Sequence, residues 1–177
     1  FVAVALLAPL IAPYDPNKSN YRFVLAPPSA EFWFGTDSYG RDVLSRILFG
    51  MRVSLHIGVM VVLATGLVGV LLGTLASYVR RLDGIVMRLL DGMMAFPGVL
   101  LAIALAAALG PAASTVIVAL TVTFVPRTAR VVRAAVLVVQ AQQYVEAARA
   151  VGAGHMRIVL RYILANALSP MIVQLTY

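Results

Sequence analysis

The sequence contains no cysteine and a single lysine, Lys18, and only 12% of its residues are charged. Without cysteine the chain cannot form a disulfide, perform thiol chemistry or hold a metal through cysteine ligands. The ATP-binding pattern G-x-x-x-x-G-K-[ST] is absent, so the chain has no phosphate-binding loop of its own. The patterns H-E-x-x-H and G-x-S-x-G are absent as well. We therefore expect no catalytic residue, no metal ligand and no cofactor in this chain.

Apolar residues dominate the sequence and make up 62% of it. Residues 53–79 contain no Asp, Glu, Lys or Arg, and neither do residues 92–126. Crossing a bilayer takes about 20 apolar residues as a helix, so these runs predict an all-α membrane protein. The net charge of +7 could suggest a nucleic-acid partner. However, the arginines form short belts between the apolar runs, as membrane topology demands, so we expect contact with membrane lipid and no nucleic acid.

The apolar runs predict the organisation of the chain. We expect residues 1–12 to be the end of a first transmembrane span and residues 13–52 to be a segment outside the membrane. Four further spans are predicted within residues 53–177, at 53–79, 83–109, 112–132 and 158–177. The sequence begins at Phe1 rather than Met and ends inside an apolar run, so we expect a piece of a longer protein whose final span is missing.

Two of the spans carry internal features with open interpretations. Gly69, Gly73 and Ser77 recur every four residues, which either lets another helix approach closely or is a chance spacing in a Gly/Ala-rich run. Phe96-Pro97-Gly98 predicts a kink or local unwinding. That kink either lines a transport path or is an ordinary proline kink in a packed helix.

The charged residues beside the spans allow further predictions. Arg88 and Asp91 are three residues apart and could pair on one helix face. Arg127, Arg130 and Arg133 lie at three-residue steps at the inner end of the predicted span 112–132, where they either snorkel to lipid headgroups or continue the helix into the cytoplasm.

Residues 13–41 are rich in turn-forming residues and show neither helical nor strand periodicity, so we expect an extended surface segment there. Asp42 is placed to cap a following helix. The apolar side chains of Val43, Leu44, Ile47 and Leu48 share one side of that helix. This pattern favours a short helix lying along the membrane surface.

The stretch 140–156 predicts a short helix followed by a sharp turn. Tyr144, Ala147, Ala148 and Val151 are spaced to share one helical face. Gly152 and Gly154 permit the backbone angles that a redirection requires. A solvated connector between two spans would show the same spacing.

This stretch also carries a family resemblance. Glu146-Ala147-Ala148, three residues, Gly152 and then Ile163-Leu164 resembles the EAA loop of binding-protein-dependent ABC importer permeases. Where the family usually has Pro after the Ile/Val-Leu pair, this sequence has Ala165. The helix kink that Pro would impose is therefore expected to be absent or shifted toward Pro170.

A second motif resembles the dipeptide, oligopeptide and nickel branch of these permeases. It is Phe34-Gly35-Thr36-Asp37 followed by Gly40-Arg41-Asp42, and the family context places it on the periplasmic side. The resemblance thus implies the MetI-like permease core, a polytopic helical bundle in the inner membrane of a bacterium or archaeon.

The resemblance implies a role in ATP-driven import by alternating access. The EAA helix would dock on one of two cytoplasmic ATPase subunits, which bind the ATP, so the chain itself would not be an enzyme. Glu146 would offer a charged contact, Ala147 and Ala148 would allow close approach, and Gly152 would supply the turn. A second permease subunit and an extracytoplasmic solute-binding protein complete the implied assembly, and peptide, nickel and other small solutes remain open as substrates.

Charge distribution agrees with this orientation. With the EAA stretch on the cytoplasmic side, nine basic residues lie inside and five outside, as the positive-inside rule expects. The alternative is a secondary transporter or channel without ATPase partners, which would need ionisable residues in mid-span. A structural membrane scaffold is a third possibility, but it leaves the EAA helix unexplained.

Overall fold

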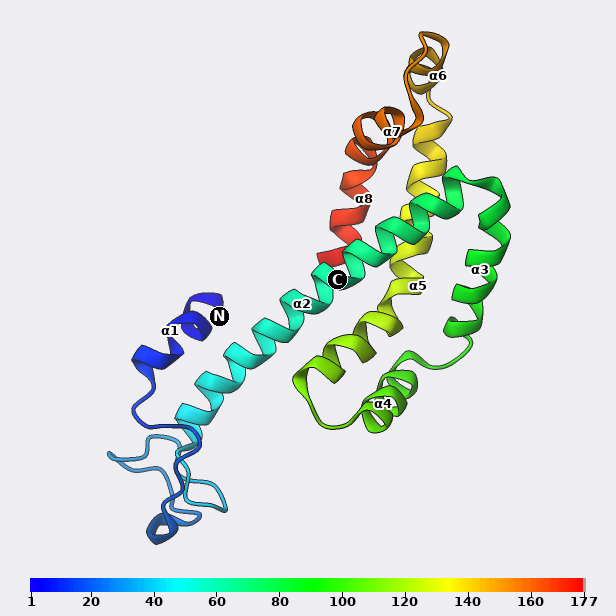
Figure 1. The fold of residues 1–177 in the computed structure, drawn as a ribbon. Coiled ribbons are helices and arrows are strands. Elements are labelled where there is room, and N and C mark those ends of the chain that lie inside the picture. Colours follow the sequence, from blue (N-terminus) through cyan, green and yellow to red (C-terminus); the bar gives the residue numbers. More distant parts are fainter. Residues whose placement is uncertain (177) are drawn as a thin grey trace. The chain divides into compact units, whose positions relative to one another are not determined.

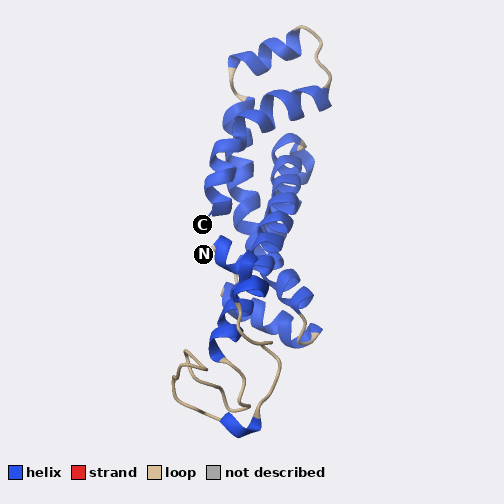
Figure 2. Ribbon diagram, turned by 90° about the vertical axis from the view of Figure 1, so that its left-hand side faces the viewer, coloured by secondary structure: helices blue, strands red, loops and turns tan. Residues whose placement is uncertain are grey.

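The computed structural model describes residues 1–176, and their regular structure is helical (Figure 2). The predicted all-α class is confirmed: within those residues β-structure amounts to one isolated bridge between Thr36 and Asp42. The chain divides into two compact units, Phe1–Val59 and Met60–Tyr177. Two helices, Val43–Tyr78 and Ala113–Gln140, are long and apolar enough to cross a membrane.

The first unit consists of helix α1 (Val2–Ile11), an irregular segment and the beginning of helix α2 (Val43–Tyr78). The irregular segment contains only the 3₁₀ turn η1 (Tyr21–Phe23), so its predicted lack of periodic structure is confirmed. Phe32 is buried there, with its ring 5.3 Å from that of Tyr14 and 5.4 Å from that of Phe23. This aromatic contact gives the segment a small core of its own.

The prediction of a separate surface helix before a span at 53–79 is wrong. The structure has one unbroken helix, α2, from Val43 to Tyr78. The predicted cap is confirmed, because Asp42 Oδ2 accepts a hydrogen bond of 2.8 Å from the Ser45 backbone N–H. Gly50 alone costs only about 1 kcal/mol in a helix, and Arg52 is a good helix former, so nothing near residue 52 breaks the helix.

In the second unit, helix α5 (Ala113–Gln140) packs against α3 (Arg80–Met94), α4 (Gly98–Leu109) and α8 (Ala165–Thr176) (Figure 1). The α2 backbone also approaches α5 closely, since a Cβ added at Gly73 would lie 2.5 Å from the Ala129 carbonyl oxygen. The helix-packing interpretation of the small-residue stripe is therefore correct. Buried side chains from α5, α6 and the C-terminal helices form the main core: Val132, Val136, Val139, Val145, Ile158, Ile163, Ala167 and Met171.

The predicted span 83–109 is two helices. α3 begins at Arg80, earlier than expected, and a break around Pro97 separates it from α4 at a bend of 87°. The kink is thus confirmed and is large. α3 is strongly amphipathic, with one polar and one apolar side, whereas α4 is apolar on all sides. The two helices therefore suit different environments.

The C-terminal half departs from the sequence-based boundaries. α5 extends to Gln140, eight residues beyond the predicted end of its span. α6 (Gln143–Ala150) and α7 (His155–Arg157) follow, and then a π-helical segment, η2 (Ile158–Leu164), leads into α8. α8 continues through Pro170, so the expected interruption is absent. The last residue of the predicted span 158–177, Tyr177, lies outside the described residues.

Candidate functional site

α6 is attached to the rest of its unit by two side chains. Val145 is fully buried in the main core, where Val139 of α5 and Ile158 of η2 also lie. Ala148, one turn later, is buried as well. These two residues hold one side of a two-turn helix, which could not be stable in isolation at that length.

The end of α6 is a Schellman motif centred on Gly152. Gly152 has φ +81°, and its N–H donates to the Arg149 carbonyl at 3.0 Å. The N–H of Ala153 donates to the Ala148 carbonyl at 3.0 Å. The predicted turn at Gly152 is confirmed, whereas Gly154 has φ −64° and ψ 150°. That is extended backbone open to any residue, so the prediction that Gly154 is needed for the turn is wrong.

The predicted apolar face of α6 divides between the core and solvent. Tyr144 is 42% exposed, Val151 is 84% exposed and Ala147 is also exposed, while Ala148 is buried. Successive residues turn by about 100°, which places Ala148 at the edge of the predicted face, next to the buried Val145, while Tyr144, Ala147 and Val151 are exposed. Glu146 is exposed as well. We call Tyr144, Glu146, Ala147 and Val151 the α6 surface.

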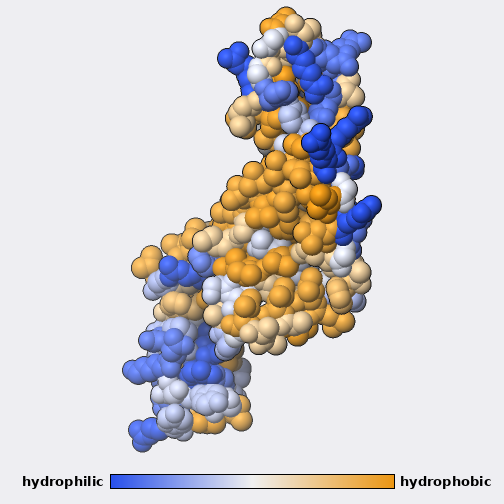
Figure 3. Space-filling model, turned by 45° about the vertical axis from the view of Figure 1, so that its right-hand side comes forward, coloured by the Kyte–Doolittle hydropathy of each residue, from blue (hydrophilic) through white to orange (hydrophobic). Residues whose placement is uncertain are grey.

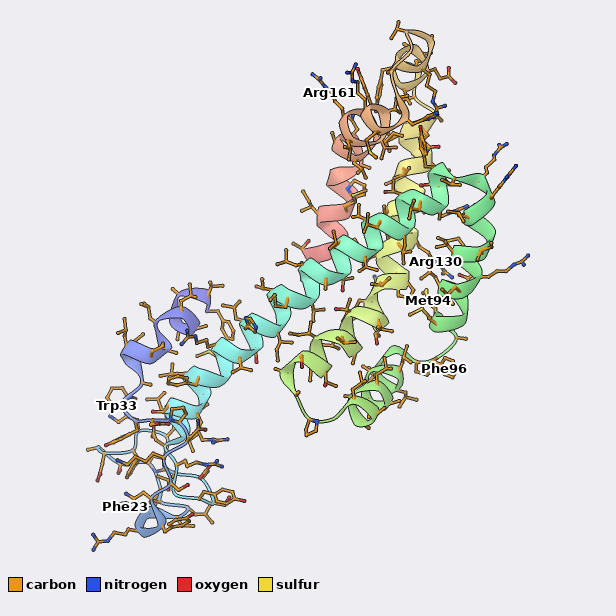
Figure 4. All side chains as sticks on the ribbon, in the orientation of Figure 1. Phe23, Trp33, Met94, Phe96, Arg130 and Arg161 are labelled. Carbon is orange, nitrogen blue, oxygen red and sulfur yellow. The ribbon has the colours of Figure 1, made fainter. Side chains whose placement is uncertain are left out.

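α3 is held to α5 by two ion pairs that the sequence did not predict. Arg133 donates two hydrogen bonds of 2.6 Å to the carboxylate of Asp83. Arg130 pairs with Asp91, reaching from α5 toward α3 in Figure 4. The predicted pairing of Arg88 with Asp91 is therefore wrong. Partners 39 and 50 residues apart leave no signal in the local pattern.

The segment 34–42 is organised around Asp37. Its Oδ1 accepts the N–H groups of Tyr39 at 2.8 Å and Arg41 at 3.0 Å, and its Oδ2 accepts Arg41 Nε at 2.8 Å. Burial alone would raise the pKa of Asp37, but the backbone N–H groups of Arg41 and Tyr39 and the Arg41 guanidinium outweigh it and hold the pKa below its usual value. The carboxylate thus stabilises the loop as an anion.

The glycines and threonine of the same segment serve its backbone. Gly35 and Gly40 have φ of +71° and +69°. A Cβ at Gly40 would lie 1.9 Å from the Asn20 carbonyl oxygen. Thr36 Oγ1 accepts the Ala26 N–H at 2.9 Å and donates to the Phe23 carbonyl. Gly35, Thr36, Asp37, Gly40 and Arg41 therefore have an internal role in closing the loop.

Metal chemistry has no candidate site in residues 1–176, since no group of three or more His, Asp or Glu side chains is placed to hold an ion. The unit Met60–Tyr177 instead presents polar side chains at the end that carries α6 and α7. Within the unit Met60–Tyr177, Figure 3 shows a broad apolar surface, with hydrophilic side chains gathered among apolar ones at the end that carries α6 and α7.

Comparison with known proteins gives a consistent family. The family model described as "Binding-protein-dependent transport system inner membrane component" matches residues 66–177. The chain is 47% identical over 176 residues to a Brucella suis biovar 1 protein whose name includes "peptide transport system permease protein". It is 40% identical over 177 residues to the dipeptide transport system permease protein of Alkalihalophilus pseudofirmus, and 44% identical over 177 residues to the glutathione transport system permease protein of Escherichia coli O6:K15:H31.

These alignments cover 99% of the chain, but the chain spans only 58–60% of the length of these curated relatives. Both sequence motifs, at residues 34–42 and 144–152, lie inside the aligned region.

Proposed function

The chain belongs to the family of binding-protein-dependent transport system inner membrane components, and from this premise we propose that it is a permease subunit of an ATP-driven importer. Its cargo would be peptides, nickel or a similar small solute. The names of the relatives, which refer to peptide, dipeptide and glutathione transport, support peptides first. The protein would reside in the inner membrane of a bacterium or archaeon.

The observation that carries the proposal is the division of α6 into an anchored side and a free side. Val145 and Ala148 fix the helix to the core, and the α6 surface is left to solvent. The α6 surface combines an exposed tyrosine and valine with a small residue and a carboxylate. This composition is more typical of a protein–protein interface than of a surface that contacts only water. We assign that partner as one of two cytoplasmic ATPase subunits.

Force applied at the α6 surface would reach the spans through the core. Val145 lies in the same buried cluster as Val136 of α5 and Met171 of α8. Displacement of α6 would therefore move both helices, because a close-packed core does not deform continuously. ATP can drive alternation between inward- and outward-facing states only by binding one state of the assembly better than the other.

The remaining components follow from the same premise. ATP would be bound and hydrolysed by the ATPase subunits, and this chain would contribute no catalytic residue. A second permease subunit would complete the translocation path, and an extracytoplasmic solute-binding protein would deliver the cargo to the side that carries residues 13–42.

A secondary transporter or channel is the second candidate, because α5 contains the ionisable residues Arg130 and Arg133. Both are paired, with Asp91 and Asp83, so their charges already serve helix contact. This candidate requires uptake by the permease proteins in the absence of ATPase subunits. The ATP-driven importer requires that uptake to be absent.

The test is Ala147→Arg in the full-length permease. Ala147 is exposed, so the new side chain leaves the fold and membrane insertion intact but obstructs the α6 surface. We expect at least a tenfold loss of ATPase subunits co-purified from membranes, and an equal loss of ATP-dependent uptake. The matched control is Ala112→Arg, an exposed alanine just before α5, at the end of that helix opposite to α6. Normal co-purification and uptake in both variants would contradict the assignment.

A further inference from the structure

An apolar groove runs between the end of α2 and the helix that follows α6. One wall is formed by α2 residues from Val70 to Tyr78 and by Val79 directly after the helix, and the other wall by residues from His155 to Leu164. The groove holds about 330 Å³, which is within the usual range for a small-molecule site. Leu75 and Leu160 are about half exposed along its rim. The groove is therefore open along its side, to the medium that surrounds the helices.

The length of the groove matches one leaflet of a bilayer. Val70 and Tyr78, the first and last wall residues on α2, are eight residues apart, which at 1.5 Å per residue is about 12 Å. The hydrocarbon core of a bilayer is about 30 Å thick, so a lipid tail in one leaflet covers about 15 Å. A single acyl chain lying along α2 would fill the groove from end to end.

One end of the groove is polar and basic. Tyr78 Oη and His155 Nδ1 lie 2.7 Å apart and join the two walls there. Arg80 follows the wall residue Val79 directly, and Arg157 follows the wall residue Met156; both arginines are exposed. Arg161 is also exposed and extends away from the same helix in Figure 4. The basic side chains thus begin where the apolar wall on α2 ends.

We propose that this groove binds an anionic phospholipid, with one acyl chain between α2 and residues 155–164 and the phosphate at Arg80 and Arg157. Basic pockets between membrane helices recruit anionic headgroups in this way. Charge complementarity selects the headgroup, and the apolar walls select the tail. The inference needs only membrane insertion and stands independently of the coupling role of α6.

Native mass spectrometry of the full-length permease in nanodiscs tests the proposal. Discs of phosphatidylglycerol and phosphatidylcholine in equal parts provide the competition, and the count of retained lipids is the readout. We expect preferential retention of phosphatidylglycerol. Arg157→Gln should lower its affinity about fivefold, which corresponds to the ~1 kcal/mol expected per basic residue near an anionic surface. Arg88→Gln, an exposed arginine on α3 outside the groove, should leave the preference unchanged.

A second variant tests the tail site separately. Leu160→Trp fills the groove from its exposed rim and should abolish retention of phosphatidylglycerol. Leu63→Trp places the same ring at an exposed α2 position outside the groove and should not. Equal retention of both lipids by the unmodified protein would overturn the proposal. So would a Leu160→Trp variant that keeps its lipid but loses the second permease subunit, since the groove would then be a subunit interface.

Discussion

The two sequence motifs of the chain both turn at a glycine with positive φ, yet they use their side chains in opposite ways. In the segment 34–42, the Asp37 carboxylate is satisfied by neighbouring groups, and Gly40 lies against the backbone of Asn20. At the end of α6, a Cβ on Gly152 would meet nothing within 4 Å, and Glu146 is exposed. The first motif is closed on itself, and the second presents a surface.

This difference distinguishes a motif that maintains a backbone conformation from a motif that provides a binding surface. Residues of the closed loop maintain a backbone shape, so replacing them should cost stability. Residues of the α6 surface contribute little to the fold, so replacing them should cost only the interaction with a partner. The following substitutions test that separation, beginning with the largest expected effect on stability.

Gly40→Ala should be the most damaging change within the closed loop. An alanine at φ +69° costs roughly 1–2 kcal/mol, and its Cβ would collide with the Asn20 carbonyl, for which overpacking adds about 1–3 kcal/mol. The midpoint of thermal unfolding in detergent should fall strongly. Gly50→Ala, at a helical position of the same unit with open space, is the control. Equal midpoints for the two variants would show that the loop is not closed as described.

Asp37→Asn should destabilise the first unit by about 1 kcal/mol at neutral pH, because charge-assisted hydrogen bonds to Arg41 and the backbone are lost. The pKa of Asp37 is lowered by folding, so this stabilisation is complete above the unfolded-state pKa near 4 and disappears as pH falls through the folded-state pKa. Thermal midpoints measured from pH 7 to pH 3 should therefore converge for the two proteins. Glu31→Gln, an exposed carboxylate nearby, is the control, and a gap that does not narrow as the pH falls would argue against the anionic role.

Gly152→Ala should lower stability by only about 1 kcal/mol, since the cost of φ +81° is not accompanied by a collision. Gly154→Ala provides the matched control two residues later, because its φ of −64° suits any residue. The thermal midpoints of the two variants should differ accordingly. An equal fall of the thermal midpoint in both variants would mean that the turn does not depend on the positive φ of Gly152.

Val151→Asp should leave the thermal midpoint within about 0.5 kcal/mol of the unmodified protein, because the side chain is 84% exposed. ATP-dependent uptake should nevertheless fall, since the new charge lies on the α6 surface. Val145→Asp is the contrasting variant on the same helix: it buries a charge in the core and should prevent folding. If Val151→Asp transports normally, the α6 surface is not a partner contact.

Local features of the sequence were predicted correctly where local chemistry decides them. Asp42 caps α2 because its carboxylate reaches a backbone N–H three residues ahead. Gly152 ends α6 because no other residue adopts its φ without cost. In each case the contacts of one residue with its sequence neighbours determine the local structure.

Features that depend on distant partners were not predicted correctly. Periodicity places Ala148 on the same face as Ala147 and Val151, and only the position of the core shows that Ala148 is buried while the other two are exposed. The partner of Asp91 lies on another helix, and Arg130 was chosen over the nearer Arg88 by tertiary packing. The continuity of α2 is hidden in the sequence, because Arg52 marks a boundary of the charge-free run although a single charge does not end a helix.

The π-helical segment Ile158–Leu164 has a consequence for how this chain can vary in length. A π turn closes its hydrogen bonds over one more residue than an α turn. The segment directly before α8 therefore contains an extra residue relative to α-helical geometry. Ala167 and Met171 of α8 are buried beside Val136, and their register cannot change freely. The loss of one residue upstream can be absorbed by converting the π turn to α geometry, so that the packed face of α8 stays aligned with α5.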